Sequence, residues 1–158
     1  MVETPNCACC GVVETAWHVV GECGHAKAVE IRVDWAKRMW ELVQAETSRR
    51  TSPLDIDVAN ALQRMWKVEE GGALRTCGNL ERINVIPGID NMDSTLKELL
   101  IGVAQAGSWA VWMGVFTRGW MDLLVAGGMQ YHRARSLTGK LSRVIRESRS
   151  AIANERAE

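Results

Sequence analysis

Four residues near the start of the chain form a metal-ligand pattern. Cys7, Cys10, His18 and Cys23 follow the spacing C-x2-C-x7-H-x4-C within seventeen residues. Three thiolates and one imidazole are a ligand set that a tetrahedral zinc ion takes in a closed structural site. Since four protein ligands leave no position for water, such a site stabilises structure and catalyses no reaction. The alternative interpretation is a set of reduced thiols with a histidine in a loop.

Glycines next to the cysteines favour the metal interpretation. Gly11 follows Cys10 and Gly24 follows Cys23. A glycine beside a ligating cysteine lets the backbone turn tightly, so that N–H groups can point at sulfur. Cys9 could replace Cys10 only by shortening the first knuckle to C-x-C, which is a less usual spacing.

Two further residues are spare ligand candidates. His25 lies two positions after Cys23, and we interpret it as a cap of the following helix or as a surface residue. Cys77 is distant in sequence and has the character of an ordinary buried thiol.

The N-terminal segment resembles a known family of zinc-binding segments. Its residues are Cys7-x2-Cys10-Gly11, Glu14-Thr15, His18-Val19-Val20, Glu22-Cys23 and Ala26. This order resembles the zinc-binding segment that follows the polymerase in reverse transcriptases of non-LTR retroelements. The resemblance covers about residues 5–40, a quarter of the chain. It implies a zinc-bound module that binds nucleic acid.

The catalytic motifs of reverse transcriptases are missing from the sequence. A polymerase needs an aspartate cluster that holds two metal ions, commonly in a Y/F-x-D-D turn. Asp55 and Asp57 merely alternate at a predicted helix start, and Asp90 follows a turn at Pro87-Gly88, a poor match to an endonuclease motif. We therefore expect no enzyme. The resemblance implies a retroelement-derived fragment without polymerase activity.

Length and composition restrict the class of protein. The chain has 158 residues and a net charge of zero, so the whole protein is not drawn to polyanions. Five cysteines, three of them in the zinc pattern, argue against a disulfide scaffold. No secretory signal is evident at the N-terminus. We expect a location in the nucleus or the cytoplasm and no membrane association.

The apolar pattern predicts a mostly α protein, an N-terminal zinc knuckle followed by a helical bundle. We expect a knuckle with two helices over 1–70, an irregular linker over 71–93 and a helical region over 94–158. A first helix should begin after Gly24 and fade near Ser48–Arg50. Its apolar stripe is Val29, Val33, Ala36, Trp40 and Val43, with Glu30, Arg32, Asp34, Lys37, Arg38 and Glu41 on its other faces.

A second helix should begin with Ser52 as N-cap and Pro53 at its first position, and end at Gly71-Gly72. Its predicted apolar face consists of Leu54, Val58, Ala61, Leu62 and Met65. Residues 71–93 contain several glycines. Ile83, Val85 and Ile86 could form a short extended piece there, but we favour a loop.

The next helix shows a capping-box spacing at Thr95 and Glu98, with Asp93 and Ser94 as alternative caps. No charged residue occurs from Leu99 to Thr117. We interpret this run as a buried core helix, broken near Gly107-Ser108, rather than a membrane span. Trp109, Trp112, Phe116 and Trp120 should fill the core, with base stacking as the alternative. A short helix should follow over Trp120–Val125 and end at Gly127-Gly128.

The last segment, from Gln130 to Arg156, predicts an amphipathic helix with one basic face. Leu137, Leu141, Val144, Ile145 and Ile152 share one side, and Arg133, Lys140, Arg143, Arg146 and Arg149 mostly share the other. Residues 130–158 contain seven Lys/Arg and three Asp/Glu, a local net charge of about +4. Such a face can follow a phosphate backbone, bind an acidic protein or simply be solvated. Gly139 marks a possible kink.

Zinc knuckles often contact single-stranded nucleic acid through a stacked aromatic ring. Trp17, directly before His18, is the candidate, and the alternative is that it packs against the first helix and covers the metal site. The candidate nucleic-acid residues are therefore Trp17, Lys140, Arg143, Arg146 and Arg149. We expect RNA or DNA as partner. The alternative is a helical protein-interaction module with a stapling zinc, whose partner would bind the apolar 99–125 region.

Overall fold

The protein is described from a computed structural model that places residues 6–11, 18, 23–65, 90, 92–105, 116 and 118–157. Across these residues the structure is helical and contains no strand. The helices are α1 (Ala26–Thr47), α2 (Ile56–Met65), α4 (Ser94–Gln105), α6 (Arg118–Ala126) and α7 (Tyr131–Ala157). The predicted mostly α fold is therefore confirmed for this part of the chain.

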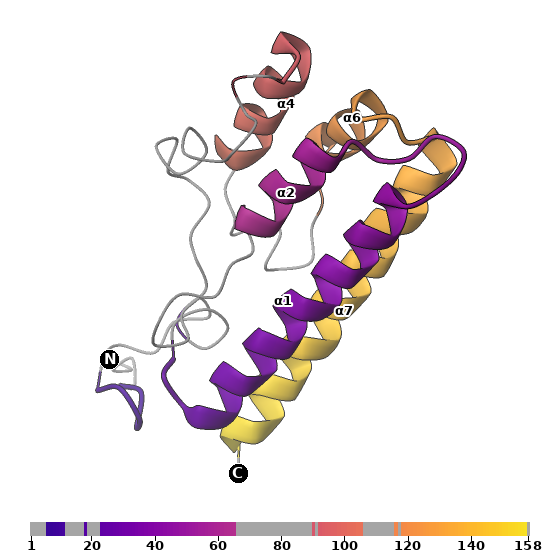
Figure 1. Ribbon diagram of the computed structural model, residues 1–158. Helices are drawn as coiled ribbons and strands as arrows, with labels where there is room; N and C mark the ends of the chain where they lie inside the picture. The colour runs from indigo at the N-terminus through magenta and orange to yellow at the C-terminus, as the bar shows by residue number, and fades with distance from the viewer. Residues whose placement is uncertain are drawn as a thin grey trace.

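The two longest helices, α1 and α7, lie side by side and run in opposite directions (Figure 1). Two ion pairs fix their register. Arg133 donates two hydrogen bonds to the Glu46 carboxylate, at 3.0 and 3.3 Å, and Arg38 donates one to Glu147 at 3.0 Å. The start of α7 therefore lies beside the end of α1, and the C-terminus lies beside the start of α1.

The buried face of α1 is not the predicted stripe. Val33 is 52 % exposed, and of the predicted stripe only Val43 is fully buried. The residues that face inward are Ala28, Arg32, Trp35, Met39, Val43 and Glu46. This face is rotated from the predicted one because it includes two charged residues, each with a hydrogen-bond partner: the Cys23 carbonyl for Arg32 and the Arg133 guanidinium for Glu46. The Trp35 indole N–H also points at the Met39 sulfur, 2.8 Å away.

The predicted faces of α2 and α7 agree better with the structure. Leu54, Val58, Ala61 and Leu62 are buried at α2. In α7 all five predicted apolar residues are buried, and the helix continues through Gly139 without interruption. The start of α2 was predicted wrongly. The helix begins at Ile56, where the Asp55 carboxylate accepts hydrogen bonds from the N–H groups of Asp57 at 2.8 Å and Val58 at 3.4 Å.

The cap of α4 is Asp93, one of the alternatives in the sequence. Its carboxylate accepts a hydrogen bond from Thr95 N–H at 2.8 Å. Phe116 and Trp120 pack edge to face with centroids 5.2 Å apart, and Trp120 is buried as predicted. Gly71-Gly72, the stretch from Ile83 to Ile86, Gly107-Ser108, Trp109 and Trp112 lie outside the described residues.

Helix α6 ends at Gly127-Gly128, as predicted. Met129 N–H donates to the Leu124 carbonyl at 3.1 Å, and Gly128 N–H donates to the Val125 carbonyl at 3.0 Å. Together with a φ of 110° at Gly128, these bonds form a Schellman motif. Asp55 N–H reaches the Gly127 carbonyl at 2.8 Å, so this turn also holds the start of α2.

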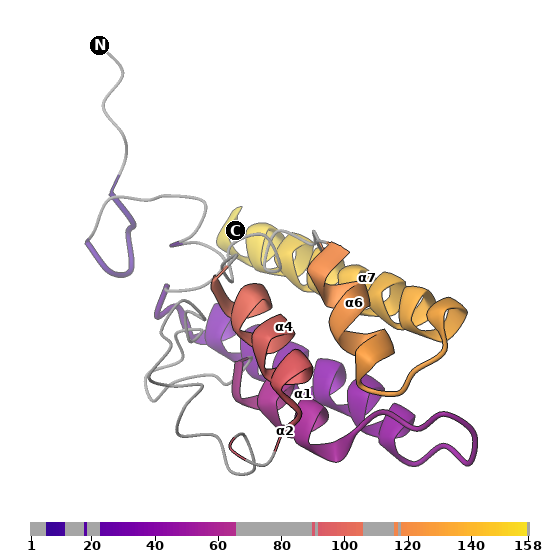
Figure 2. The same cartoon turned by 90° about the horizontal axis from the view of Figure 1, so that it is seen from above.

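The helices form a circuit in which each packs mainly on two neighbours, in the order α1, α2, α4, α6 and α7 (Figure 2). One hydrophobic cluster runs from Ala28 in α1 to Ile152 in α7. The regions 1–70 and 94–158 therefore contribute to the same core. Within the described part of the chain, no helix is both long and apolar enough to cross a membrane.

Candidate metal centre

The four predicted ligands come together in space. One ligand atom from each of Cys7, Cys10, His18 and Cys23 lies within 4.8 Å of the others. The Sγ of Cys23 is 3.6 Å from that of Cys7 and 4.0 Å from that of Cys10. A tetrahedral ion with metal–sulfur bonds of about 2.3 Å holds its sulfurs about 3.8 Å apart. The separations fit a metal site, whereas a disulfide would need about 2.05 Å between the sulfurs.

Local backbone structure positions these sulfurs. Gly11 N–H donates to the Cys7 carbonyl at 2.8 Å, which closes a turn over Cys7–Gly11, and Gly11 has a φ of 73°. On the other side of the cluster, Cys23 N–H donates to the His18 carbonyl at 2.7 Å. Gly24 N–H points at the Cys10 Sγ, 3.3 Å away. The predicted use of a glycine N–H toward sulfur is confirmed at Gly24.

The thiols ionise at different pH. A hydrogen bond from the Cys10 backbone is the main cause that lowers the pKa of Cys7 to about 6, and the His18 side chain contributes. Burial raises the pKa of Cys23 to about 11. Hydrogen bonding at Cys7 thus favours the thiolate, whereas burial of Cys23 favours the protonated thiol.

A buried arginine joins the cluster to the helices. Arg32 is fully buried in α1, and its Nη1 donates to the Cys23 carbonyl at 2.6 Å. The predicted position of Arg32 on an outer face is wrong, and no role for this residue was predicted. The available signal was its spacing, because Arg32 lies four residues after Ala28 and three before Trp35 on the buried stripe.

Among the described residues, neither Cys9 nor His25 belongs to the set of four converging ligands. Cys9 is exposed. His25 occupies the N-cap position of α1, but its side chain makes no capping hydrogen bond, and its buried Nδ1 has no hydrogen-bond partner among the described residues. Cys77 and Trp17 lie outside the described residues.

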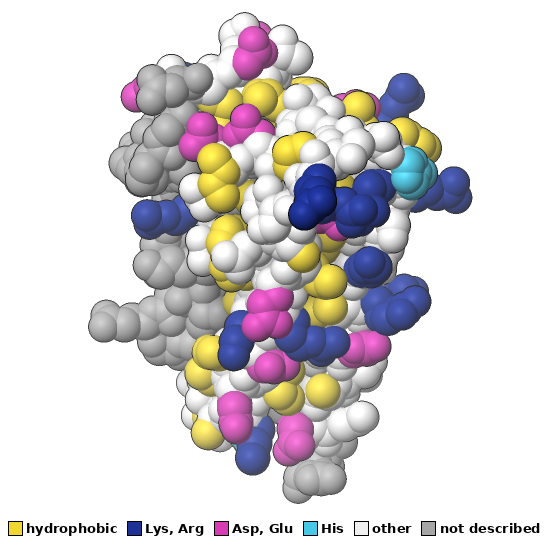
Figure 3. Space-filling view, turned by 45° about the vertical axis from the view of Figure 1, so that its right-hand side comes forward, with side chains coloured by type: hydrophobic (Ala, Val, Ile, Leu, Met, Phe, Trp, Pro, Cys, Tyr) yellow, Lys and Arg dark blue, Asp and Glu magenta, His cyan; other side chains and the backbone are white. Residues whose placement is uncertain are grey.

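The basic residues predicted on α7 divide into two groups. Lys140, Arg143 and Arg146 are exposed, whereas Arg149 is half-buried and Arg133 is bound to Glu46. Figure 3 shows Lys and Arg side chains gathered over the face that carries α7. The structure thus leaves three of the predicted cations open to solvent.

The apolar 99–125 region lies partly in the core where the structure describes it. Leu100, Val103, Trp120, Leu123 and Leu124 belong to the core, and Val125 is 42 % exposed. These five buried residues pack on the protein's own helices, while Gly102, Arg118, Asp122 and Val125 of the same region are exposed.

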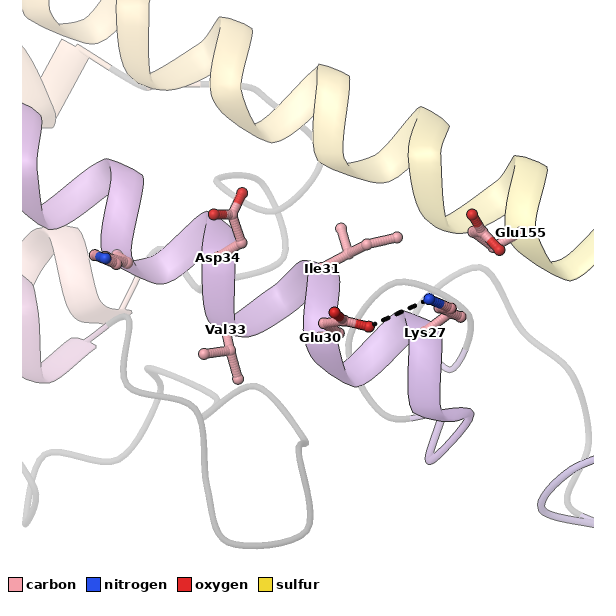
Figure 4. A pocket seen from close by; sticks show the side chains of 7 residues that line it. Lys27, Glu30, Ile31, Val33, Asp34 and Glu155 are labelled. Atoms are coloured by element: carbon pink, nitrogen blue, oxygen red, sulfur yellow. Dashed lines mark ion pairs between the residues drawn. The ribbon is translucent and has the colours of Figure 1, made fainter.

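A pocket of about 550 Å³ lies along the outer side of α1 and reaches Glu155 of α7 (Figure 4). Its lining carries both charge signs, from Lys27, Lys37, Glu30, Asp34 and Glu155, together with Ile31 and Val33. Lys27 and Glu30 form an exposed ion pair at 3.7 Å. This mixture contains no thiol, hydroxyl or imidazole and favours neither an anion site nor nucleophilic catalysis.

The chain matches no protein-family model, and comparison with curated proteins and with solved structures gives no match either.

Proposed function

We propose that Cys7, Cys10, His18 and Cys23 bind one structural Zn²⁺ and that the protein is a nucleic-acid-binding module. The observation that carries the proposal is the convergence of four soft ligand atoms within 4.8 Å. The resemblance to the zinc-binding segment of non-LTR-retroelement reverse transcriptases supports it. In this proposal the protein is a retroelement-derived fragment without polymerase activity.

The chemistry of the ligands favours zinc over hard cations. Thiolate and imidazole ligands suit Zn²⁺, while Mg²⁺ and Ca²⁺ prefer oxygen. A zinc ion with three thiolates and a neutral imidazole carries one net negative charge. The buried Arg32 guanidinium, bound to the Cys23 carbonyl, is a positive charge close to that centre. Zinc ligation would contribute about 10 kcal/mol or more to local folding at neutral pH.

The exposed cations of α7 support the nucleic-acid part of the proposal. Lys140, Arg143 and Arg146 lie on the outer side of a helix whose inner side is packed on α1. Each contact between such a cation and a phosphate releases counterions, so affinity arises without sequence readout and falls with salt.

Metal content tests the zinc site. Native mass spectrometry of the purified protein should show one zinc ion per chain, and Cys23→Ala should lose it. Cys9→Ala is the matched control, because Cys9 is an exposed thiol in the same segment, and it should retain zinc. Wild-type protein without bound metal, or equal retention by both variants, would contradict the proposal.

A salt titration tests nucleic-acid binding. The affinity for a labelled oligonucleotide should fall steeply with salt, and replacing Lys140, Arg143 and Arg146 by Gln should reduce the slope by about 0.7–0.9 for each lost phosphate contact. Lys27 and Lys37, on the outer side of α1, provide the control substitutions. A binding activity that salt does not change would favour the protein-interaction module instead.

A further inference from the structure

One exposed ridge of α7 combines an aromatic ring with guanidinium groups. Tyr131, the first residue of the helix, is 64 % exposed. Arg135, Gly139 and Arg143 follow it at intervals of four residues and are exposed as well. Residues four apart are neighbours on one helix face. We call Tyr131, Arg135, Gly139, Arg143 and the adjacent Arg146 the outer ridge.

The outer ridge keeps its positive charge. Within the described part of the chain, Arg135, Lys140, Arg143 and Arg146 form no ion pair. Two carboxylates at the contact between α1 and α7 bind other arginines, Glu46 to Arg133 at 3.0 Å and Glu147 to Arg38 at 3.0 Å. These two carboxylates therefore do not neutralise the free guanidinium groups, which remain available to an anionic partner.

The middle of the ridge is open. A Cβ added at Gly139 would meet nothing within 4 Å. Arg135 and Arg143 are eight residues apart, which is about 12 Å along a helix axis. A chain with regularly spaced phosphates can thus contact both guanidinium groups and approach the backbone between them.

We infer that the outer ridge binds a single-stranded polynucleotide, with a base stacked on Tyr131 and phosphates on Arg135, Arg143 and Arg146. This inference rests on the proposed function and specifies its ligand. A single strand exposes the faces of its bases, and an exposed aromatic ring next to arginines is a platform for any of them. A duplex keeps its bases stacked on one another, so no base face would be available to stack on Tyr131.

Fluorescence anisotropy with labelled oligouridine, oligothymidine and a duplex of equal length tests the inference on the full-length, metal-loaded protein. Tyr131→Ala should weaken single-strand binding by about 5- to 150-fold, while duplex binding should be weak and unchanged. Tyr131→Phe keeps the ring and should stay within about twofold of wild type. Ile56→Ala, at another exposed apolar residue, is the control and should have no effect. The tighter of the two single strands identifies RNA or DNA as the ligand.

The outcomes separate the inference from the proposed function. Wild-type protein that binds none of the three probes overturns both. Binding that Tyr131→Ala leaves unchanged, or a preference for the duplex, overturns the inference alone. Circular dichroism of each variant shows that a loss of affinity is not a loss of fold.

Discussion

At the scale of single residues, Arg32 connects the cysteine cluster to the helical core. Its fully buried guanidinium donates to the Cys23 carbonyl at 2.6 Å, in the backbone of a candidate ligand. We expect Arg32→Met to weaken zinc binding by about 10- to 100-fold, the effect typical of losing an outer-shell partner of a metal site. Competition with a chromophoric chelator measures this affinity.

Arg38→Met is the matched control for Arg32→Met. Arg38 lies on the same helix, but its side chain is 42 % exposed and pairs with Glu147 at the surface. The Arg38→Met substitution should change stability by less than about 1 kcal/mol and leave zinc affinity unchanged. Equal zinc affinities in the Arg32 and Arg38 variants would show that the buried guanidinium does not support the site.

Gly128 offers a second prediction at this scale. It has a φ of 110°, and a Cβ added there would lie 2.7 Å from the Pro53 carbonyl oxygen. Both features oppose a side chain, because the conformation is strained and the clashing atom is backbone. Gly128→Ala should destabilise the protein by about 1–3 kcal/mol, as measured by urea unfolding. A variant as stable as wild type would mean that this turn can shift without loss.

At the scale of elements, α7 and α1 show what the sequence can predict. The α7 face was predicted correctly because all of its marker residues are aliphatic, and all are buried. The α1 face was predicted wrongly because its inward positions include Arg32 and Glu46. A search for apolar residues at helical spacing cannot identify a buried charged residue. Arg32 is buried because it binds the Cys23 carbonyl, and Glu46 because it binds the Arg133 guanidinium of α7. Likewise, the Asp55 carboxylate caps α2. Ser52 and Pro53 have the residue types of an N-cap and a first helical position, but the helix begins only at Ile56.

The continuity of α7 through Gly139 leads to a prediction for this element. Gly139 lies in the exposed interior of the helix, and a Cβ there meets nothing within 4 Å. Replacing it by alanine reduces the entropy lost on folding, without strain. Gly139→Ala should therefore stabilise the protein by about 0.5–1 kcal/mol in the same urea experiment. The Gly139→Ala and Gly128→Ala variants should shift the midpoint of urea unfolding in opposite directions. A lower stability of both variants would contradict the open position of Gly139.

At the scale of the whole molecule, the sequence predicts which four ligands converge, but it does not predict which helices pack on each other. The C-x2-C-x7-H-x4-C spacing correctly predicted which side chains come together, because all four lie within a short stretch of chain. The pairing of α1 with α7 depends instead on contacts between residues about a hundred positions apart, such as Arg38 with Glu147. Many amphipathic helices could have satisfied either face, so the choice of partner is a property of the folded core.

The four candidate ligands and the hydrophobic core are formed by different residues, and this separation predicts the effect of removing the metal. None of the four candidate ligands belongs to the hydrophobic cluster that runs from Ala28 to Ile152. A chelator should therefore release the first 25 or so residues and leave the helices of the core largely intact. Alkylation followed by mass spectrometry should then label Cys7, Cys10 and Cys23 only after chelation, because a bound metal masks their thiolates. The helical signal in far-UV circular dichroism should change little.

Cys9 is the internal control for this alkylation experiment, since it is exposed and should be labelled both with and without chelator. Labelling of the three candidate ligands that is as fast before chelation as after it would show that no metal protects them. A large loss of helical signal on chelation would instead show that the metal stabilises the α1–α7 pair as well. The natural route for that coupling is Arg32, the described side chain that hydrogen-bonds Cys23 from within the core. Repeating the chelation on Arg32→Met would test this route, because the helices should then no longer respond to the metal.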